Sequence, residues 1–167
     1  MKVTSFGVAV IEGDRLSGMV EQAGTLACAD GWLQTFKAYI PDGGTVVDIG
    51  AALGDHTVSY AKMVGAAGTV HAVEPYGPFL ECLRYNTQHK SNIVVHPVAL
   101  GIGETFGRME RSTVQPNNLG MTHLVTTALG DVVVTTLDRL AARFERLDFV
   151  KIDVEGMEPA VLDGAKG

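Results

Sequence analysis

Two hydrophobic periods alternate along the middle of the chain. Residues 45–50 (TVVDIG), 68–75 (GTVHAVEP) and 92–100 (NIVVHPVAL) are short, apolar and rich in β-branched residues, which predicts three strands. Between them, residues 55–65 and 78–89 carry apolar side chains at helical spacing, which predicts two helices. Strands and helices that alternate with short connections predict a parallel sheet covered by helices.

The segments before this core have weaker patterns. Residues 5–14 (SFGVAVIEGD) predict a short strand that ends in a turn. Residues 30–39 predict a short helix with Asp30 as its N-cap. The apolar residues on one face of this helix are Trp32, Leu33, Phe36 and Tyr39.

After the third strand the periodicity is lost. Residues 101–130 are polar and contain five glycines, so we expect a long surface excursion with at most a hairpin around 105–110. Residues 132–144 predict a strand and a short helix, and residues 147–153 predict a fourth core strand. A last helix is expected over residues 157–165.

Length and charge narrow the class of protein. The 167 residues fit one domain, with residues 1–44 as a lead-in and residues 45–167 as a cofactor-binding core. The net charge of −6 and the scattered basic residues argue against partners that are nucleic acids or anionic membranes. No apolar stretch approaches the roughly 20 residues of a membrane span, and the N-terminus is a poor signal peptide. A cytoplasmic protein is expected, with Cys28 and Cys82 as free thiols.

The turn after the first core strand suggests a nucleotide-like ligand. Asp48, Gly50 and Gly54 lie on this turn, where glycine allows close approach and the next helix offers free N–H donors. A dinucleotide fingerprint fails because Ala52 and Asp55 occupy its other two positions. An acid before the glycines would also repel a pyrophosphate. S-adenosylmethionine, which has no phosphate and carries positive groups, fits this turn better.

A second acid supports this interpretation. Glu74 ends the second core strand, 20 residues after Gly54. A carboxylate at that strand tip can accept hydrogen bonds from both hydroxyls of a ribose. The turn and Glu74 therefore predict a site for S-adenosylmethionine.

Four motifs together resemble the FkbM-type methyltransferases. These are VVDIGAALGDHT, VHAVEPYGPFLECLRYNTQH, VALG and FVKIDVEGMEPAVLDGA, of which the last is the most specific. The resemblance implies a class I, Rossmann-like fold and methyl transfer from S-adenosylmethionine to a small acceptor, often a sugar or metabolite hydroxyl. It also implies the cofactor-binding residues, which are Asp48, Gly50, Ala51, Gly54, Thr57, Glu74, Pro75, Ala99, Leu100 and Asp153.

The chain departs from that family in two ways. Ala52 stands where members usually carry Asn, which removes a polar group from the cofactor turn. The seven-stranded class I sheet would also continue past residue 167, so we expect a three-layer α/β sandwich with a mostly parallel sheet, truncated at its C-terminus. The fourth core strand would then lie at an open edge, and either residues 6–11 or a second subunit in a homodimer would cover it.

Three carboxylates follow the fourth core strand. Asp153 and Glu155 are the predicted catalytic residues, able to act as general base on an acceptor hydroxyl or to orient it. Glu158 is expected to start the last helix, where its charge meets the helix dipole. No second acidic cluster or Cys/His spacing supports a metal, so none is predicted. Lys151 is expected to pair with a buried acid.

Other polar residues have weaker signals. His71 and His96 fall within strands and are interpreted as structural, whereas His56 beside the cofactor turn is a minor candidate for acceptor contact. Asn117 and Asn118 carry amides suited to sugar hydroxyls and could belong to an acceptor lid or to an ordinary turn. Two other functions stay open: a non-catalytic module that binds S-adenosylmethionine, and, less favoured, a nicotinamide oxidoreductase.

Overall fold

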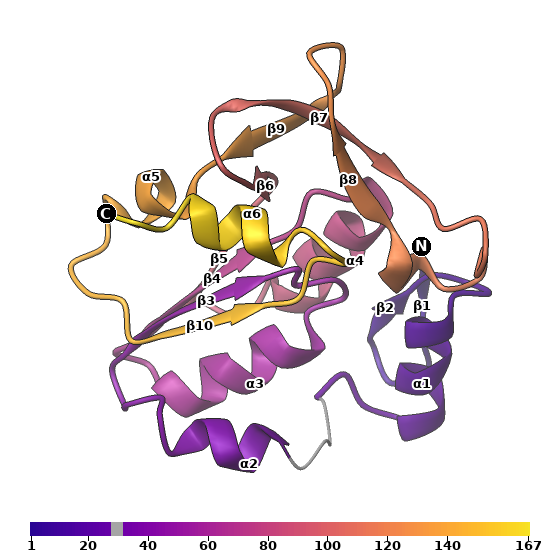
Figure 1. Cartoon of the computed structure of the whole chain (residues 1–167). Helices are drawn as coiled ribbons and strands as arrows, with labels where there is room; N and C mark the ends of the chain where they lie inside the picture. The colour runs from indigo at the N-terminus through magenta and orange to yellow at the C-terminus, as the bar shows by residue number, and fades with distance from the viewer. Residues whose placement is uncertain (28–31) are drawn as a thin grey trace.

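The computed structural model describes residues 1–27 and 32–167 and contains a parallel central sheet (Figure 1). Its strands are β3 (Thr45–Ile49), β4 (Thr69–Val73), β5 (Ile93–His96) and β10 (Phe149–Ile152), in the order β10-β3-β4-β5. All three strand pairs are parallel. The carboxyl ends of the four strands therefore meet at one edge of the sheet, where open α/β sheets bind their ligands.

Helices cover both faces of this sheet. On one face lie α2 (Trp32–Lys37), α3 (Asp55–Val64) and α4 (Gly77–Thr87). Their side chains pack on sheet residues such as Val46, Val70 and Ala72. On the other face, α5 (Leu137–Ala141) and α6 (Glu158–Asp163) bury Val47, Ile49 and Val73. The predicted three-layer α/β fold is confirmed.

A second sheet lies above the carboxyl edge of the first (Figure 1). It consists of β6 (Ala99–Leu100), β7 (Thr105–Glu110), β8 (His123–Thr126) and β9 (Val132–Thr135), in the order β6-β9-β7-β8. A 3₁₀ helix, η1 (Leu119–Met121), precedes β8. The surface excursion expected over residues 101–130 is therefore wrong in part, since a third of this segment, the strands β7 and β8, is paired into a sheet.

The third predicted strand also needs correction. Residues 92–100 form two strands in different sheets, β5 and β6, which are separated around Pro97. A proline has no N–H for a strand ladder and often ends strand pairing. The chain leaves the central sheet after His96 and enters the second sheet at Ala99, two residues after Pro97.

The N-terminal segment packs beside the carboxyl edge. It contains a hairpin of β1 (Lys2–Val3) and β2 (Ala9–Val10) and a helix, α1 (Arg15–Ala23). Asp14 joins it to η1, because Oδ2 accepts from the backbone N–H of Ser17 at 2.9 Å and Oδ1 accepts from that of Leu119 at 2.9 Å. Asn86 in α4 bonds both the N–H and the carbonyl of Ala9.

Predictions for the lead-in are confirmed only in part. Leu33 and Phe36 pack into the core, but Tyr39 is 67% exposed because α2 ends at Lys37. The cap predicted at Asp30 lies outside the described residues.

The two predicted thiols have different outcomes. Cys82 is a buried free thiol in α4, and burial raises its pKa. Cys28 lies outside the described residues, as does the side chain of Trp32.

Strand β10 lies at the end of the strand order. In the described part of the chain it pairs only with β3. Residues 6–11 do not cover its outer edge, because β2 pairs with β1 instead. That part of the prediction is wrong, and the covering subunit of a homodimer stays a prediction.

Candidate functional site

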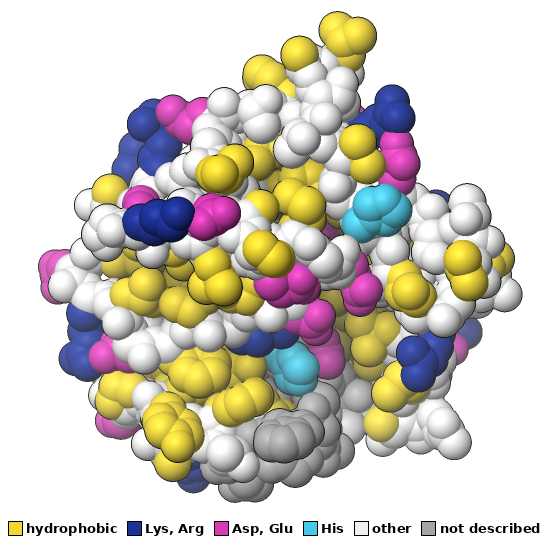
Figure 2. Space-filling model, viewed as in Figure 1, with side chains coloured by type: hydrophobic (Ala, Val, Ile, Leu, Met, Phe, Trp, Pro, Cys, Tyr) yellow, Lys and Arg dark blue, Asp and Glu magenta, His cyan; other side chains and the backbone are white. Residues whose placement is uncertain are grey.

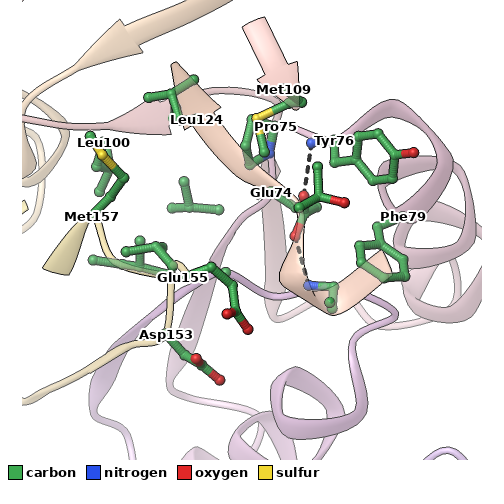
Figure 3. A pocket seen from close by; sticks show the side chains of 18 of the residues that line it. Glu74, Pro75, Tyr76, Phe79, Leu100, Met109, Leu124, Asp153, Glu155 and Met157 are labelled. Carbon is green, nitrogen blue, oxygen red and sulfur yellow. Dashed lines mark hydrogen bonds between the residues drawn. The ribbon is translucent and has the colours of Figure 1, made fainter. Parts of the chain in front are cut away.

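The carboxyl ends of β3, β4 and β10 open into a cavity of about 140 Å³. Gly50 follows β3, Glu74 follows β4 and Asp153 follows β10, and all three line the cavity. Residues 98–100 line a further side. Side chains from the second sheet and η1, including Met109, Leu119 and Leu124, contribute to the wall (Figure 3).

The glycine turn is shaped by its contact with the loop after β10. Gly50 has a φ of 81°, and a Cβ there would overlap the carbonyl oxygen of Asp153. The N–H groups of Gly50 and Ala51 both donate to the carbonyl of Val73, at 3.0 and 3.1 Å. Glycine is therefore required at position 50 so that the ends of β3 and β10 can lie in contact. This requirement is separate from any need for a ligand to approach the turn closely.

Gly54 has a different role in the same turn. It is the N-cap of α3 with a φ of 92°, and a Cβ would meet Leu83 of α4 at 2.8 Å. This glycine therefore serves the packing of two helices. It does not line the cavity.

Glu74 is the most buried acid of the cavity wall, with 5% of its surface exposed. Its Oε2 accepts from the N–H of Ala52 and its Oε1 from the N–H of Tyr76, both at 2.8 Å (Figure 3). Burial raises the pKa of Glu74 to about 7, although these two N–H bonds lower it. Each carboxylate oxygen has a second lone pair, so both can still accept from a ligand.

Asp48 lies beneath the turn and has no exposed surface. Its Oδ2 accepts from the hydroxyl of Thr57 at 2.6 Å, and its Oδ1 lies 3.3 Å from Lys151 Nζ. Lys151 also donates to the carbonyl of Gly50 at 2.9 Å. The expected pairing of Lys151 with a buried acid is therefore confirmed, and Asp48 holds the turn from below.

The two predicted catalytic carboxylates lie together on the loop after β10 (Figure 3). The Asp153 side chain is 64% exposed, and its Oδ2 is 3.6 Å from Lys151 Nζ. Glu155 has a φ of 52°, an uncommon conformation for a residue with a side chain. Partial burial raises the pKa of Glu155, and the charges of Asp153 and Glu158 add to this effect. A carboxyl with a raised pKa is a better proton acceptor.

Glu158 fixes the shape of this loop. It is the first residue of α6, as predicted, and its carboxylate reaches back to the N–H groups of Val154 (2.9 Å) and Gly156 (3.0 Å). These bonds lower the pKa of Glu158. The carboxylate therefore holds the backbone on both sides of Glu155.

The predicted site residues divide into two groups. Those that line the cavity are Gly50, Glu74, Pro75, Ala99, Leu100, Asp153 and Glu155. Those that lie behind it and support the turn are Asp48, Ala51, Gly54 and Thr57. The second group is close to the site without facing it.

Sequence reasoning missed the wall supplied by the second sheet. Met109 of β7 and Leu124 of β8 line the cavity, as do Leu119, Thr122 and Met157. The hairpin expected around residues 105–110 was the only signal for this region, and it did not indicate a cavity wall.

The weaker candidates lie elsewhere. Asn117 and Asn118 do not line this cavity; the Asn118 amide donates to Gln115 at 3.2 Å. Of the residues after them, Leu119, Gly120 and Thr122 line this cavity. Met121 and His123 line a second cavity, of about 420 Å³, which Glu155 also lines. His71 Nδ1 lies 2.9 Å from His96 Nε2, which agrees with a structural role, and the His56 ring lies 6.0 Å from that of Tyr60.

Two searches of the described residues have negative results. No group of three or more His, Cys, Asp or Glu side chains there is placed to hold a metal ion. Within the same residues, no helix is long and apolar enough to cross a membrane.

Comparison with family models gives a match over most of the chain. The model described as Methyltransferase FkbM domain matches residues 48–167, which include the glycine turn, Glu74 and the loop after β10. A search of curated proteins finds no significant match.

Solved structures share only part of the fold. A SAM-dependent O-methyltransferase from Thermotoga maritima is 16% identical, with a TM-score of 0.41, over 49% of this chain and 33% of its own. A SAM-dependent methyltransferase from Aquifex aeolicus is 26% identical, with a TM-score of 0.35, over 38% of this chain and 35% of its own.

A third similar structure contains a ligand. The fibrillarin from Aeropyrum pernix, in complex with natively bound S-adenosyl-L-methionine, is 18% identical, with a TM-score of 0.36. The match covers 36% of this chain and 26% of the fibrillarin. The aligned region thus spans about a third or less of each of these three proteins.

Proposed function

Since the chain belongs to the FkbM methyltransferase family, we propose that it transfers a methyl group from S-adenosylmethionine to a hydroxyl of a sugar or another small metabolite. The observation that carries the proposal is the convergence of three strand tips on one cavity. Gly50, Glu74 and Asp153 come from three adjacent strands and line the same space.

Different walls of the cavity match different parts of S-adenosylmethionine. Glu74 at the tip of β4 is placed to accept from the ribose hydroxyls, with its own position held by the N–H groups of Ala52 and Tyr76. Val98, Ala99 and Leu100 form an apolar wall next to it for the adenine. Gly50 and Asp153 lie on the side where the methionine and the methyl group would bind.

Methyl transfer is an in-line displacement, so orientation of the two reactants supplies much of the rate. The acceptor oxygen forms a bond to the methyl carbon as the carbon–sulfur bond breaks and its electron pair stays on sulfur. The proton of the hydroxyl must leave, and Asp153 and Glu155 are the carboxylates placed to receive it. Two such groups beside the cavity favour turnover over a module that only binds the cofactor.

The first test is a calorimetric titration with S-adenosylhomocysteine, with NAD as the competing ligand. Saturable binding of S-adenosylhomocysteine alone is expected, and binding of NAD alone would contradict the proposal. Release of S-adenosylhomocysteine from S-adenosylmethionine over a panel of hydroxylated acceptors then tests turnover. Binding without any turnover would favour the non-catalytic module.

A pair of variants tests the carboxylate role. Asp153→Asn is expected to lower the turnover number about 100-fold or more if Asp153 acts as the base. Asp163→Asn is the matched control, because Asp163 makes a surface ion pair with Lys166 and does not line the cavity. Equal turnover in both variants would remove Asp153 from the mechanism and leave Glu155 as the remaining carboxylate.

A further inference from the structure

The N-terminal segment, residues 1–27, lies outside the region that matches the FkbM domain model, which begins at residue 48. The segment nevertheless reaches the cavity proposed for the cofactor, because Leu16 of α1 lines it. In Figure 2, acidic side chains gather near the middle of this face, between the central sheet and the N-terminal segment at the right. Part of the cavity wall therefore comes from a stretch of chain that carries none of the family motifs.

Apolar packing attaches this segment to the cavity wall. One hydrophobic cluster joins two residues of the segment to the glycine turn, to α4 and to η1; its members include Val10, Val20, Leu53, Phe79 and Leu119. Each of these side chains is at most 7% exposed. Phe79 and Leu119 also line the cavity, so the segment packs directly on residues of its wall.

Asn86 of α4 connects the hairpin of the segment to the glycine turn. Its Oδ1 accepts from the N–H of Ala9 at 2.7 Å. Its Nδ2 donates to the carbonyls of Ala9 at 3.0 Å and Leu53 at 2.9 Å. These bonds hold the β1–β2 hairpin, whereas α1 is attached at Asp14.

Asp14 serves the N-termini of two helices at once. It is the N-cap of α1, and its Oδ2 accepts from the N–H and from the hydroxyl of Ser17, both at 2.9 Å. Its Oδ1 accepts from the N–H of Leu119, the first residue of η1, whose own N-cap, Asn118, makes no side-chain bond to that helix. Asp14 is 5% exposed and lies 105 residues before Leu119. A buried carboxylate thus connects α1 to a distant part of the chain.

The connection is made where both helices reach the cavity. Beside the bond of Asp14, the N–H of Arg15 donates to the carbonyl of Asn117 at 2.9 Å. Leu16 follows on α1, Leu119 begins η1, and both line the cavity. The bonds of Asp14 and Arg15 therefore hold together two elements that enclose the same space.

We propose that residues 1–27 form a cap on the cofactor cavity, that Asp14 holds this cap against η1, and that this contact slows the release of bound cofactor. Asp14 is a positioning residue, because it acts through Leu119 and does not itself line the cavity. The inference rests on the proposed function and adds a part of the chain that determines how long the cofactor stays bound.

Asp14→Asn separates the two roles of Asp14. Asn is as good an N-cap as Asp, so α1 keeps its cap. A carboxylate has two acceptor oxygens and an amide has one, so the amide nitrogen faces the N–H of Leu119 and the bond to η1 is lost.

Two control variants accompany it. Ser17→Ala removes a hydroxyl that donates to Asp14 and accepts from the N–H of Ile11, but it leaves the bond between Asp14 and Leu119 in place. Glu12→Gln removes a negative charge at an exposed residue that does not line the cavity.

The experiment is surface plasmon resonance of S-adenosylhomocysteine on the immobilised full chain, together with amide hydrogen exchange with and without this ligand. The dissociation rate constant is expected to rise at least tenfold in Asp14→Asn and less than twofold in either control. In the unaltered protein the ligand is expected to slow exchange in α1 and η1. In Asp14→Asn the slowing in α1 is expected to be lost, while β3 and β4 keep their protection.

Dissociation from Asp14→Asn at the unaltered rate would overturn the inference, even if hydrogen exchange shows that α1 has unfolded, because loss of the cap would then make no difference. An equal rise in either control would also overturn it, since general loosening or the loss of charge would explain the effect. Neither result contradicts the proposed function. Absence of S-adenosylhomocysteine binding to the unaltered protein would overturn both proposals.

Discussion

The ammonium of Lys151 lies 3.3 Å from Oδ1 of Asp48, across the paired strands β10 and β3. Asp48 has no exposed surface, so this pair is buried. Burial alone would lower the pKa of Lys151, but the charges of Asp48 and Asp153 outweigh it and raise that pKa. The lysine also holds the Gly50 carbonyl, so the ion pair connects strand pairing with the cofactor turn.

Lys151→Met is therefore expected to destabilise the protein by about 3–5 kcal/mol, because it leaves the Asp48 carboxylate buried without its cation. The measurement is urea unfolding at pH 7. The double variant Asp48→Asn/Lys151→Met removes both charges and is expected to recover much of the loss. If the double variant is no more stable than Lys151→Met alone, the cost arises from packing and the electrostatic explanation is wrong.

Ala52 is strained in the turn that it shares with Gly50. Its φ is 46°, a left-handed conformation that costs a residue with a Cβ roughly 1–2 kcal/mol. Ala52→Gly is expected to stabilise the protein by up to about 1 kcal/mol, once the greater backbone entropy of glycine is subtracted. Ala52→Asn is expected to gain too, since Asn tolerates this conformation.

Thermal unfolding of the three proteins checks this prediction, with Ala51→Gly as the control. Ala51 is buried and is not among the residues with a positive φ. Glycine at this position therefore relieves no strain; it only removes a packed methyl group and increases the backbone entropy of the unfolded chain. A loss of stability in Ala52→Gly as large as that in Ala51→Gly would show that the left-handed conformation carries no strain.

Local patterns were sufficient for the central sheet because its strands and helices follow one another closely. The spacing from Gly54 to Glu74 placed Glu74 correctly on the cavity wall, and the apolar run before Asp153 did the same for Asp153 and Glu155. For the second sheet, the sequence indicated a strand after residue 132 and a hairpin around residues 105–110, but not how these strands pair. Strand β7 pairs with β8 and β9 across long connections, and a Cβ at Gly130 would overlap the backbone of Gly107. Pairing of this kind depends on distant backbone contacts, which no short window of sequence contains.

The second cavity was unpredictable for the same reason. Glu155 was identified from its position after a buried strand, but it lines a common cavity with Thr113 and His123 because β7 and β8 pair beside the strand tips. Conversely, Asp48 and Thr57 were placed in the site by motif, and the structure puts them behind the turn. A sequence motif identifies the residues that shape a turn, but tertiary packing determines which of these residues face the ligand.

Glu74 is expected to make cofactor binding depend on pH. Its pKa of about 7 lies above the ordinary 4.5, so the free protein carries it protonated below pH 7. The ribose hydroxyls bind best to the ionised carboxylate, and affinity for S-adenosylhomocysteine is therefore expected to rise about tenfold from pH 6 to pH 8. Calorimetric titration across this range measures it.

The control for Glu74 is Glu74→Gln, which keeps an acceptor oxygen at a group that does not titrate. Its affinity is expected to be lower at pH 8 and nearly independent of pH. A pH dependence in Glu74→Gln as steep as in the unaltered protein would assign the effect to another group, such as Glu155.

The histidine pair between β4 and β5 is expected to make the fold sensitive to acid. His71 Nδ1 lies 2.9 Å from His96 Nε2, and the ring of Phe144 stacks on His71 at 3.9 Å between centroids. Burial lowers the pKa of His71 to about 4, with a smaller contribution from the charge of His96, and burial also lowers the pKa of His96. Both rings are therefore neutral in the folded protein at pH values where the unfolded chain takes up protons.

The direction of the effect follows from this difference. Between pH 6.5 and about 4 the unfolded state binds more protons than the folded state at His71, so the free energy of unfolding falls as the pH falls through this window. Urea unfolding at half-unit steps from pH 7 to pH 4 measures the slope. His71→Gln is expected to flatten it markedly, whereas His89→Gln, at an exposed histidine after α4, is expected to leave it unchanged. Equal slopes in both variants would show that carboxylates alone cause the loss of stability in acid.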